Sequence, residues 1–288
     1  MSSTMQKGVH RRALGIGVRD QVMAPYGLET GGDGKPSIPL PSHEYVTFFD
    51  DFLGDLVLDE WAAVEGDTGF SAALANITNG VYRISGSETG GVTHAACGAL
   101  TTGTFKQWKA DMGGPHRGRL RLAARVKSGT ISTTAEGGRT HFFVGFSDSG
   151  GAESPAYDTG AGVISNAADL VGVLWAPTSA SYSDRFQCVA VKSTAGDSGD
   201  LLAVPATAVA PVSNVYNTIE IEVRNGIGDT GSAAHFWIDG KRVATINSPV
   251  KSDVALSPWI GAWVQDTGFA LSFDIDYVSI SAPRDTGE

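Results

Sequence analysis

Residues 216–223 read Tyr-Asn-Thr-Ile-Glu-Ile-Glu-Val, residues 235–243 read His-Phe-Trp-Ile-Asp-Gly-Lys-Arg-Val, and residues 273–280 read Phe-Asp-Ile-Asp-Tyr-Val-Ser-Ile. Apolar and polar side chains alternate in each run, which is typical of a β-strand with one buried face. Asp-Gly at 239–240 lies between two such runs, and this pair is preferred in two-residue hairpin turns. The C-terminal quarter of the chain therefore predicts paired strands of a sheet.

The rest of the chain repeats this pattern in short segments separated by turns rich in Gly, Ser and Asp. No long stretch has the period of a helix, and no internal repeat is present. Many short strands with such turns indicate a β-sandwich or jelly roll. We expect strands at 45–52, 56–61, 80–85, 95–100, 119–126, 140–146, 170–175, 186–191, 219–223, 234–238, 243–246, 259–264 and 271–280.

The amino-acid composition argues against some classes of binding partner. The formal net charge of -10 argues against a nucleic-acid partner, which needs a basic face. No apolar run approaches the length of about 20 residues that crosses a membrane, so no membrane partner is expected. The first 12 residues are polar and basic and lack the apolar core of a secretion signal. Synthesis in a reducing cytoplasm is therefore expected, with Cys97 and Cys188 as two buried thiols rather than a disulfide.

Residues 1–44 differ from the body at 45–288, and we interpret them as an extended N-terminal arm. Four basic residues against one acidic residue make the first 25 positions positive, whereas the body is acidic. The arm also holds apolar residues that a purely solvated linker would not need. We expect it to become ordered on a neighbouring subunit. The residues predicted to bind this partner are Arg11, Arg12, Arg19, Met23, Pro25, Tyr26 and Leu28.

Two parts of the sequence resemble a known family. A strand, an aromatic-Ile-Asp-Gly-Lys hairpin and a closing strand with Asp-Tyr-Val resemble the back sheet of the concanavalin A-like (laminin G-like) jelly roll. The run Phe-Phe-Asp-Asp-Phe-Leu-Gly-Asp at 48–55, followed by Trp61, resembles the start of laminin G-like proteins carried in tailed-bacteriophage genomes. The resemblance implies an all-β concanavalin A-like jelly-roll sandwich preceded by the arm, and it implies a protein of the phage virion.

Paired carboxylates are the first candidates for chemistry. Glycoside hydrolysis needs two carboxyl groups about 5 to 10 Å apart across the sugar bond. Glu220 and Glu222, and likewise Asp274 and Asp276, are two residues apart on predicted strands, so the members of each pair share a face. Neither pair has a third carboxylate, and both are on strands that the resemblance makes structural. We therefore interpret them as solvent-facing charges of an outer sheet and predict no catalytic residue.

The remaining motifs do not predict a catalytic, nucleotide or metal site. The Asp-Ser-Gly turn at 148–150 lacks a suitably placed histidine for a protease triad. Gly-Ile-Gly-Asp-Thr-Gly at 226–231 precedes a predicted strand, whereas a dinucleotide site needs a helix there. The six histidines form no ligand pair. Asp148, Glu153, Asp158 and Asp169 lie in a Gly/Ser-rich region suited to calcium, but without a fixed spacing, so we predict no metal and no cofactor.

Two functions remain open from the sequence. The first is a non-enzymatic protein that decorates or cements a capsid, assembled in the host cytoplasm and located on the virion surface. Its partners would be the major capsid protein and copies of itself in a homo-oligomer such as a trimer. The alternative is a lectin-like carbohydrate-binding module of a head or tail fibre. Its glycan platform would be Trp259 and Trp263, which are four apart and share one strand face.

Overall fold

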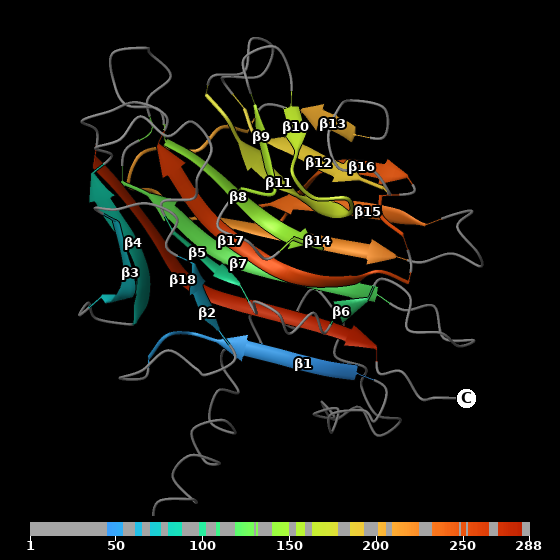
Figure 1. Cartoon of the computed structure of the whole chain (residues 1–288), viewed down its shortest axis with the longest axis horizontal. Coiled ribbons are helices and arrows are strands. Elements are labelled where there is room, and N and C mark those ends of the chain that lie inside the picture. The colour runs from blue at the N-terminus through green and yellow to red at the C-terminus, as the bar shows by residue number, and fades with distance from the viewer. Residues whose placement is uncertain are drawn as a thin grey trace, which may run out of the picture. The chain divides into compact units, whose positions relative to one another are not determined.

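The computed structural model describes residues 45–53, 61–64, 70–75, 80–87, 98–101, 108–109, 119–129, 131, 140–149, 154–158, 163–177, 185–192, 201–205, 209–224, 232–247, 249–251, 253–264 and 270–283. The N-terminal arm and its seven predicted partner-binding residues lie outside these ranges. The described secondary structure consists of strands alone (Figure 1). No described segment forms a helix long and apolar enough to span a membrane.

The strands form two eight-stranded sheets and one small hairpin. Sheet 1 has the order β16-β15-β14-β7-β18-β4-β3, with β1 also paired to β18. Its strands are β1 (Tyr45–Asp50), β3 (Phe70–Ala75), β4 (Val81–Ser87), β7 (Arg119–Ser128), β14 (Asn217–Arg224), β15 (Ala233–Ile238), β16 (Lys241–Asn247) and β18 (Ala270–Pro283).

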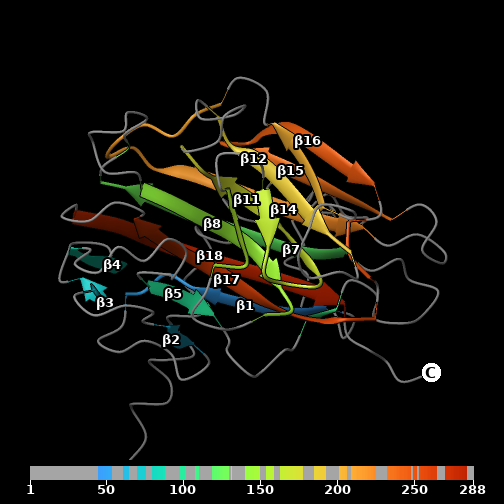
Figure 2. The same cartoon turned by 45° about the horizontal axis from the view of Figure 1, so that its top comes forward.

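Sheet 2 has the order β13-β12-β11-β8-β17-β5-β2, with β6 also paired to β17. Its strands are β2 (Ala62–Val64), β5 (Gly98–Thr101), β6 (Trp108–Lys109), β8 (Thr140–Ser147), β11 (Leu170–Trp175), β12 (Gln187–Val191), β13 (Leu201–Pro205) and β17 (Ala255–Val264). The hairpin consists of β9 (Ala156–Asp158) and β10 (Val163–Ser165). Strands distant in sequence, such as β7 and β18, are neighbours in these sheets (Figures 1 and 2).

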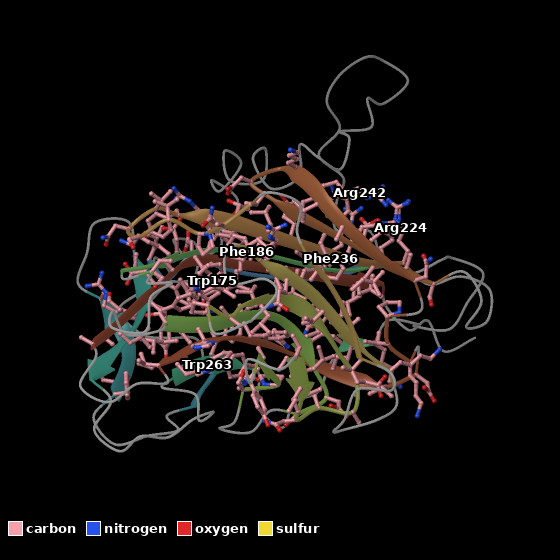
Figure 3. All side chains as sticks on the ribbon, turned by 90° about the horizontal axis from the view of Figure 1, so that it is seen from above. Trp175, Phe186, Arg224, Phe236, Arg242 and Trp263 are labelled. Atoms are coloured by element: carbon pink, nitrogen blue, oxygen red, sulfur yellow. The ribbon has the colours of Figure 1, made fainter. Side chains whose placement is uncertain are left out.

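The two sheets pack face to face around an aromatic and aliphatic core. The ring of Phe142 on β8 lies 5.2 Å from that of Phe273 on β18, so this pair joins the sheets. Phe186 adds edge contacts to Phe142 and to Trp175, at 5.8 and 6.1 Å between centroids. Figure 3 shows Trp175 and Phe186 inside the sandwich. The predicted all-β concanavalin A-like jelly-roll sandwich is confirmed.

The predicted hairpin is confirmed in detail. The turn residues Asp239 and Gly240 have φ angles of 51° and 73°, as a type I′ turn requires. The Asp239 carboxylate also accepts hydrogen bonds from the Thr218 amide and from the Asn217 side chain, both at 2.8 Å. These contacts anchor the turn to the start of β14. Asp-Gly is therefore used here for its backbone conformation and for its side-chain acceptor.

Sheet 2 differs from the half-buried sheet that the alternating pattern predicts. Every residue of β8, β11 and β12 is buried, so both faces of these strands are covered. Gly145 and Gly172 make room for Phe143 on the face away from sheet 1. A Cβ on Gly172 would meet the Phe143 ring at 2.2 Å, and one on Gly145 would meet the Val171 carbonyl oxygen at 2.4 Å. The glycines therefore set the packing of this second apolar layer.

Sheet 1 keeps the simple alternation, and this arrangement positions the candidate site. Leu120, Leu122, Ala124 and Val126 of β7 are buried, while most of the residues between them are partly or fully exposed. The neighbouring strands β14 and β15 alternate in the same way. The outer face of sheet 1 is consequently polar, and we call it the charged face. The strands that the sequence did not predict, β2, β3, β6, β9, β10 and β13, belong to sheet 2, to the small hairpin or to the edge of sheet 1.

Candidate functional site

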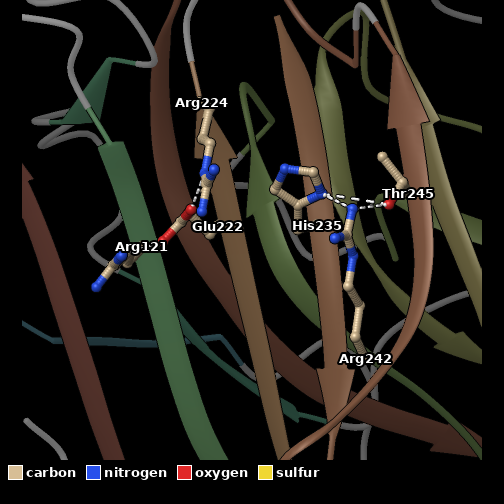
Figure 4. A network of polar contacts seen from close by, with 6 residues as sticks. All are labelled: Arg121, Glu222, Arg224, His235, Arg242 and Thr245. Carbon is tan, nitrogen blue, oxygen red and sulfur yellow. Dashed lines mark hydrogen bonds and ion pairs between the residues drawn. The ribbon is translucent and has the colours of Figure 1, made fainter. Parts of the chain in front are cut away.

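The charged face is built from residues that meet across four neighbouring strands. The register places Arg121 of β7 opposite Glu222 of β14, Glu222 opposite His235 of β15, and His235 opposite Thr245 of β16. Alternation makes all four side chains point to the outer side of the sheet. Figure 4 shows these four side chains together with Arg224, which binds Glu222, and Arg242, which binds His235.

Glu222 is the carboxylate of this row, and only 5% of its side chain is exposed. One carboxylate oxygen pairs with Arg121, and the other accepts a hydrogen bond from Arg224 Nε. Burial alone would raise the pKa of Glu222, but the hydrogen bond from Arg224 and the charges of both arginines outweigh it and lower the pKa. Glu222 is therefore a carboxylate held between two cations.

His235 forms a second polar group beside it. The Arg242 guanidinium is 2.6 Å from His235 Nδ1, and it also donates to Thr245 Oγ1 at 2.5 Å. Because a guanidinium only donates, Nδ1 accepts, and the network assigns the proton of the neutral ring to Nε2. Burial and the Arg242 charge both lower the pKa of His235. The imidazole is thus neutral, and Arg242 keeps its full charge.

The next row holds the accessible aromatic ring. Glu220 of β14 lies between Ala123 of β7 and Trp237 of β15, and Trp237 lies opposite Arg242 of β16. Trp237 is partly exposed, whereas the other five tryptophans of the chain are buried. Burial raises the pKa of Glu220, and the Arg121 charge only partly offsets this. In the register, Trp237 therefore has Glu220 on one neighbouring strand and Arg242 on the other, and the Arg242 guanidinium reaches to His235 and Thr245 of the adjacent row.

A second polar cluster lies on the same face at the β7–β18 pair. Asp274, with 1% of its side chain exposed, accepts two hydrogen bonds from Arg83, at 2.6 and 2.8 Å, and pairs with Lys127 at 2.9 Å. Arg125 binds Asp276 at 2.7 Å. The Arg125 guanidinium and the Lys127 ammonium lie 4.4 and 4.8 Å from the ring centre of Tyr216, within the range of cation–π attraction.

The carboxylate pairs predicted from sequence therefore fall on the outer face of sheet 1. Each pair sits on one strand of sheet 1, as predicted. The prediction that these are solvent-facing charges is wrong for Glu222 and Asp274, which are 4% and 1% exposed because arginine and lysine side chains from neighbouring positions enclose them. Arg83 and Arg121 were missed as partners because they are about 100 to 190 positions away in sequence, whereas Arg224 lies two residues from Glu222 on the same strand. The described strands of sheet 2 contain no Asp or Glu, so they supply no comparable pair.

Trp259 and Trp263 do share one face of β17, as the spacing predicted. Their rings are 6.5 Å apart and edge to face, and Trp263 stacks on His141 at 5.4 Å. This face points away from sheet 1, yet both indoles are 0% exposed. The two rings therefore present no open surface to a sugar in this structure, and their Nε1 atoms have no hydrogen-bond partner among the residues that the structure describes.

The acidic loop residues have structural contacts. Asp148 accepts a hydrogen bond from the Ala168 amide at 3.1 Å, and Asp169 accepts one from the Lys251 amide at 2.8 Å. The side chains of Glu153 and Asp158 lie outside the described residues. Within the described part of the chain, no group of three His, Cys, Asp or Glu side chains could hold a metal ion.

Cys188 is a free, buried thiol, and burial raises its pKa to about 12. This confirms the prediction of a buried thiol for Cys188, while Cys97 lies outside the described residues. The Asp-Ser-Gly turn at 148–150 includes an ordinary local contact, in which the Ser149 amide donates to Ser147 Oγ at 2.9 Å. The Gly-rich segment at 226–231 also lies outside the described residues.

Comparison with known proteins gives matches in structure alone. No family model and no curated protein sequence matches the chain. A solved endo-β-1,4-glucuronan lyase from the fungus Trichoderma reesei matches with a TM-score of 0.51 and 10% identity, covering 81% of this chain and 94% of the lyase. A glycoside hydrolase family 16 endo-glucanase from Bacteroides ovatus matches with a TM-score of 0.52 and 12% identity, covering 81% of this chain and 99% of the glucanase.

These likenesses correct the function expected from the sequence. At such low identity they establish the jelly-roll fold and no specific activity. The two structures described above are enzymes that act on carbohydrate polymers, and this finding contradicts the prediction of a non-enzymatic capsid-decoration protein. The physical reason for the error is that the strand and hairpin motifs specify the jelly roll, which hosts many functions. We therefore withdraw both the capsid assignment and the exclusion of enzymatic activity.

Proposed function

We propose that the protein binds carbohydrate on the charged face of sheet 1, around Trp237. The observation that carries this proposal is the position of that ring. It is the accessible tryptophan of the chain, and it lies between Glu220 and Arg242 in a cross-strand row. Sugar rings have apolar C–H faces and hydroxyl edges, so they are bound by an aromatic ring with hydrogen-bonding groups beside it.

The surroundings of Trp237 supply both kinds of contact. His235 lies edge to face with it at 5.9 Å between ring centres, and this contact supports the indole from one side. Arg242 and Glu220 offer donors and acceptors to hydroxyl groups. The shared fold with carbohydrate-active proteins supports this assignment.

Replacing Trp237 with alanine is expected to weaken carbohydrate binding without unfolding the protein. Loss of the stacked ring costs roughly 1–2 kcal/mol, which is about five- to thirtyfold in Kd. The measurement is affinity electrophoresis of the full chain through gels containing soluble polysaccharides. Trp237→Phe should retain part of the affinity because it keeps a ring. Val212→Ala is a matched control, since Val212 is an apolar side chain 59% exposed outside the strands. Equal retardation of wild type and Trp237→Ala would refute the site.

A second function, glycoside hydrolysis, is favoured by the opposite environments of Glu220 and Glu222. Residues two apart on a strand are separated by about 6.7 Å, within the span of carboxyl pairs in glycosidases. The pKa is raised for Glu220 and lowered for Glu222, which are the directions expected of a general acid and of a second, ionised carboxylate. Glu222 would act through its charge, because both of its oxygens already bind arginines.

If the chain hydrolyses a polysaccharide, Glu220→Gln is expected to lower the rate by about a hundredfold or more, because the amide cannot donate the proton. The measurement is release of reducing ends from a panel of soluble polysaccharides. Asp276→Asn is the matched control, because it removes a carboxylate from the same face but outside the pair. Wild-type hydrolysis that persists in Glu220→Gln would exclude Glu220 as the general acid, and a panel with no hydrolysis at all would leave binding as the proposal.

A further inference from the structure

We infer that the carbohydrate is an acidic polysaccharide, whose carboxylate or sulfate groups bind the cations of the charged face. This inference rests on the proposed carbohydrate-binding function and adds the chemical class of the ligand. Its starting point is a contrast in charge. The whole chain has a formal net charge of -10, whereas the described part of the charged face is positive.

The charged face carries seven cationic side chains and four carboxylates among the residues that the structure describes. The register and the ion pairs place them on strands β4, β7, β14, β16 and β18. The cations are Arg83, Arg119, Arg121, Arg125, Lys127, Arg224 and Arg242, and the carboxylates are Glu220, Glu222, Asp274 and Asp276. A positive excess on an acidic protein indicates a surface suited to a negatively charged partner.

The ion pairs do not remove this excess. Glu222 is shared by Arg121 and Arg224, and Asp274 is shared by Arg83 and Lys127. Each of these groups has two cations for one carboxylate and so keeps a positive charge. Arg242 contacts a neutral imidazole and a hydroxyl, so its charge is not neutralised by either. The internal network holds the guanidinium groups in place and leaves net charge to attract an anion.

The cations also reach solvent. The exposed fraction of the side chain is 46% for Arg224, 44% for Arg125 and 36% for Arg83. Arg119 and Arg242 belong to the exposed residues as well. A planar guanidinium can bind a carboxylate or a sulfate with two parallel hydrogen bonds. An anionic group can therefore bind on this face without displacing Glu222 or Asp274.

The spacing of the cations suits a chain of acidic sugars. On β7, Arg119, Arg121, Arg125 and Lys127 occupy alternate positions, about 6.7 Å per two residues, interrupted only by Ala123. Neighbouring strands lie about 4.8 Å apart, close to the length of one pyranose unit in an extended chain. Trp237 lies among these cations and adds a ring face for stacking. A polymer with an anionic group on successive sugars would meet several cations at once.

The test uses the full chain and three soluble polysaccharides: polygalacturonate, dextran sulfate and a neutral β-glucan. A single-stranded DNA oligonucleotide serves as an anion of a different class. Binding is measured by titration at low and moderate sodium chloride concentration. We expect at least one acidic polysaccharide to bind more tightly than the neutral glucan. We also expect its affinity to fall by about tenfold or more with added salt, as cation–polyanion contacts do. The stronger of polygalacturonate and dextran sulfate identifies the preferred anionic group.

The residues are tested with a double variant, Arg119→Gln with Arg242→Gln. Both side chains are exposed, and glutamine is shorter than arginine but keeps a polar donor without the charge, so folding should be preserved. We expect the affinity for the acidic polysaccharide to fall at least fivefold. The matched control is Lys109→Gln with Lys251→Gln, which removes two exposed positive charges from outside the charged face. Arg119→Gln alone, with an expected smaller loss, replaces the double variant if that variant unfolds.

The outcomes separate this inference from the function on which it rests. If the neutral glucan binds as tightly as the acidic polymers, the acidic ligand class is refuted and carbohydrate binding stands. If no polysaccharide is retained, both proposals fail. Tighter binding of the oligonucleotide would overturn the polysaccharide assignment, and equal losses in the test and control variants would overturn the site.

Discussion

Replacing Asp274 with alanine is expected to lower the free energy of unfolding by about 3 kcal/mol. Its carboxylate is 1% exposed and binds Arg83 through both oxygens and Lys127 through one. Removing it leaves two cations side by side with no counter-charge, on strands β4 and β7 that flank β18. This loss of stability is at the lower end of the range for breaking a buried ion pair, because the Arg83 side chain is 36% exposed and its charge is screened by water. Urea unfolding at pH 7 measures it.

The same variant has an expected pH dependence. Burial raises the pKa of Asp274, but the hydrogen bonds and charges of Arg83 and Lys127 outweigh it, so the folded pKa lies below its usual 3.8. A lowered folded pKa stabilises the protein above the unfolded pKa, and that stabilisation is lost as pH falls through the folded value. The difference between wild type and variant should therefore persist from pH 7 to about pH 4 and shrink below it.

Asp276→Ala is the matched control for this prediction. Asp276 is two residues away on the same strand, but its side chain is 18% exposed and pairs with Arg125, which is 44% exposed. A solvated pair of this kind contributes less than about 1 kcal/mol. Equal losses in the free energy of unfolding for the two variants would show that the enclosure of Asp274 between two cations does not account for its contribution to stability.

Replacing Trp263 with alanine is expected to cost about 3–5 kcal/mol in stability. The indole is 0% exposed and packs against His141 and Trp259, so its removal leaves a cavity in the apolar layer on the far side of sheet 2. We expect the fraction that folds to keep its affinity for carbohydrate. Denaturant unfolding and affinity electrophoresis of the same preparation measure both quantities.

Trp237→Ala is the converse of Trp263→Ala, since it should lose affinity and keep stability. A Trp263→Ala protein with wild-type stability and no carbohydrate binding would contradict this assignment. It would restore Trp259 and Trp263 as the glycan platform that their shared strand face first indicated.

Much of the fold could be predicted from local sequence. The runs at 219–223, 234–238 and 271–280 alternate because sheet 1 has one face in the core and one in water. The Asp-Gly pair fixes a turn whose two residues have positive φ. In these segments local propensity and tertiary environment favour the same structure, so the pattern was sufficient. The same alternation placed Glu220 and Glu222 on an outer face.

Sheet 2 could not be predicted in the same way. Its strands are covered on both faces, so β8 and β11 are nearly continuous apolar runs without a period that shows which side faces sheet 1. Trp259 and Trp263 were assigned a shared face, but their burial depends on packing that no local pattern contains. Phe143 is accommodated by Gly145 and Gly172, and Gly172 is on another strand.

The candidate site was hidden for a related reason. A strand pattern gives the direction of a side chain, but it does not give the partner that a neighbouring strand supplies. Glu222 is held by Arg121 from β7, and Asp274 by Arg83 from β4. The order of the strands in the sheet decides which side chains meet, and the sequence does not reveal that order. The basic residues at alternate positions of 119–127 were the available signal for a cationic face.

The most direct test of carbohydrate binding at the charged face is quenching of tryptophan fluorescence by acrylamide, with and without bound polysaccharide. Trp237 is the accessible tryptophan, and the five others are buried, so quenching reports on this face. We predict that a polysaccharide shown to bind the full chain will reduce quenching in the wild type and have no such effect in Trp237→Phe. Bound polysaccharide that leaves the quenching of wild-type protein unchanged would contradict the account and place the ligand elsewhere on the molecule.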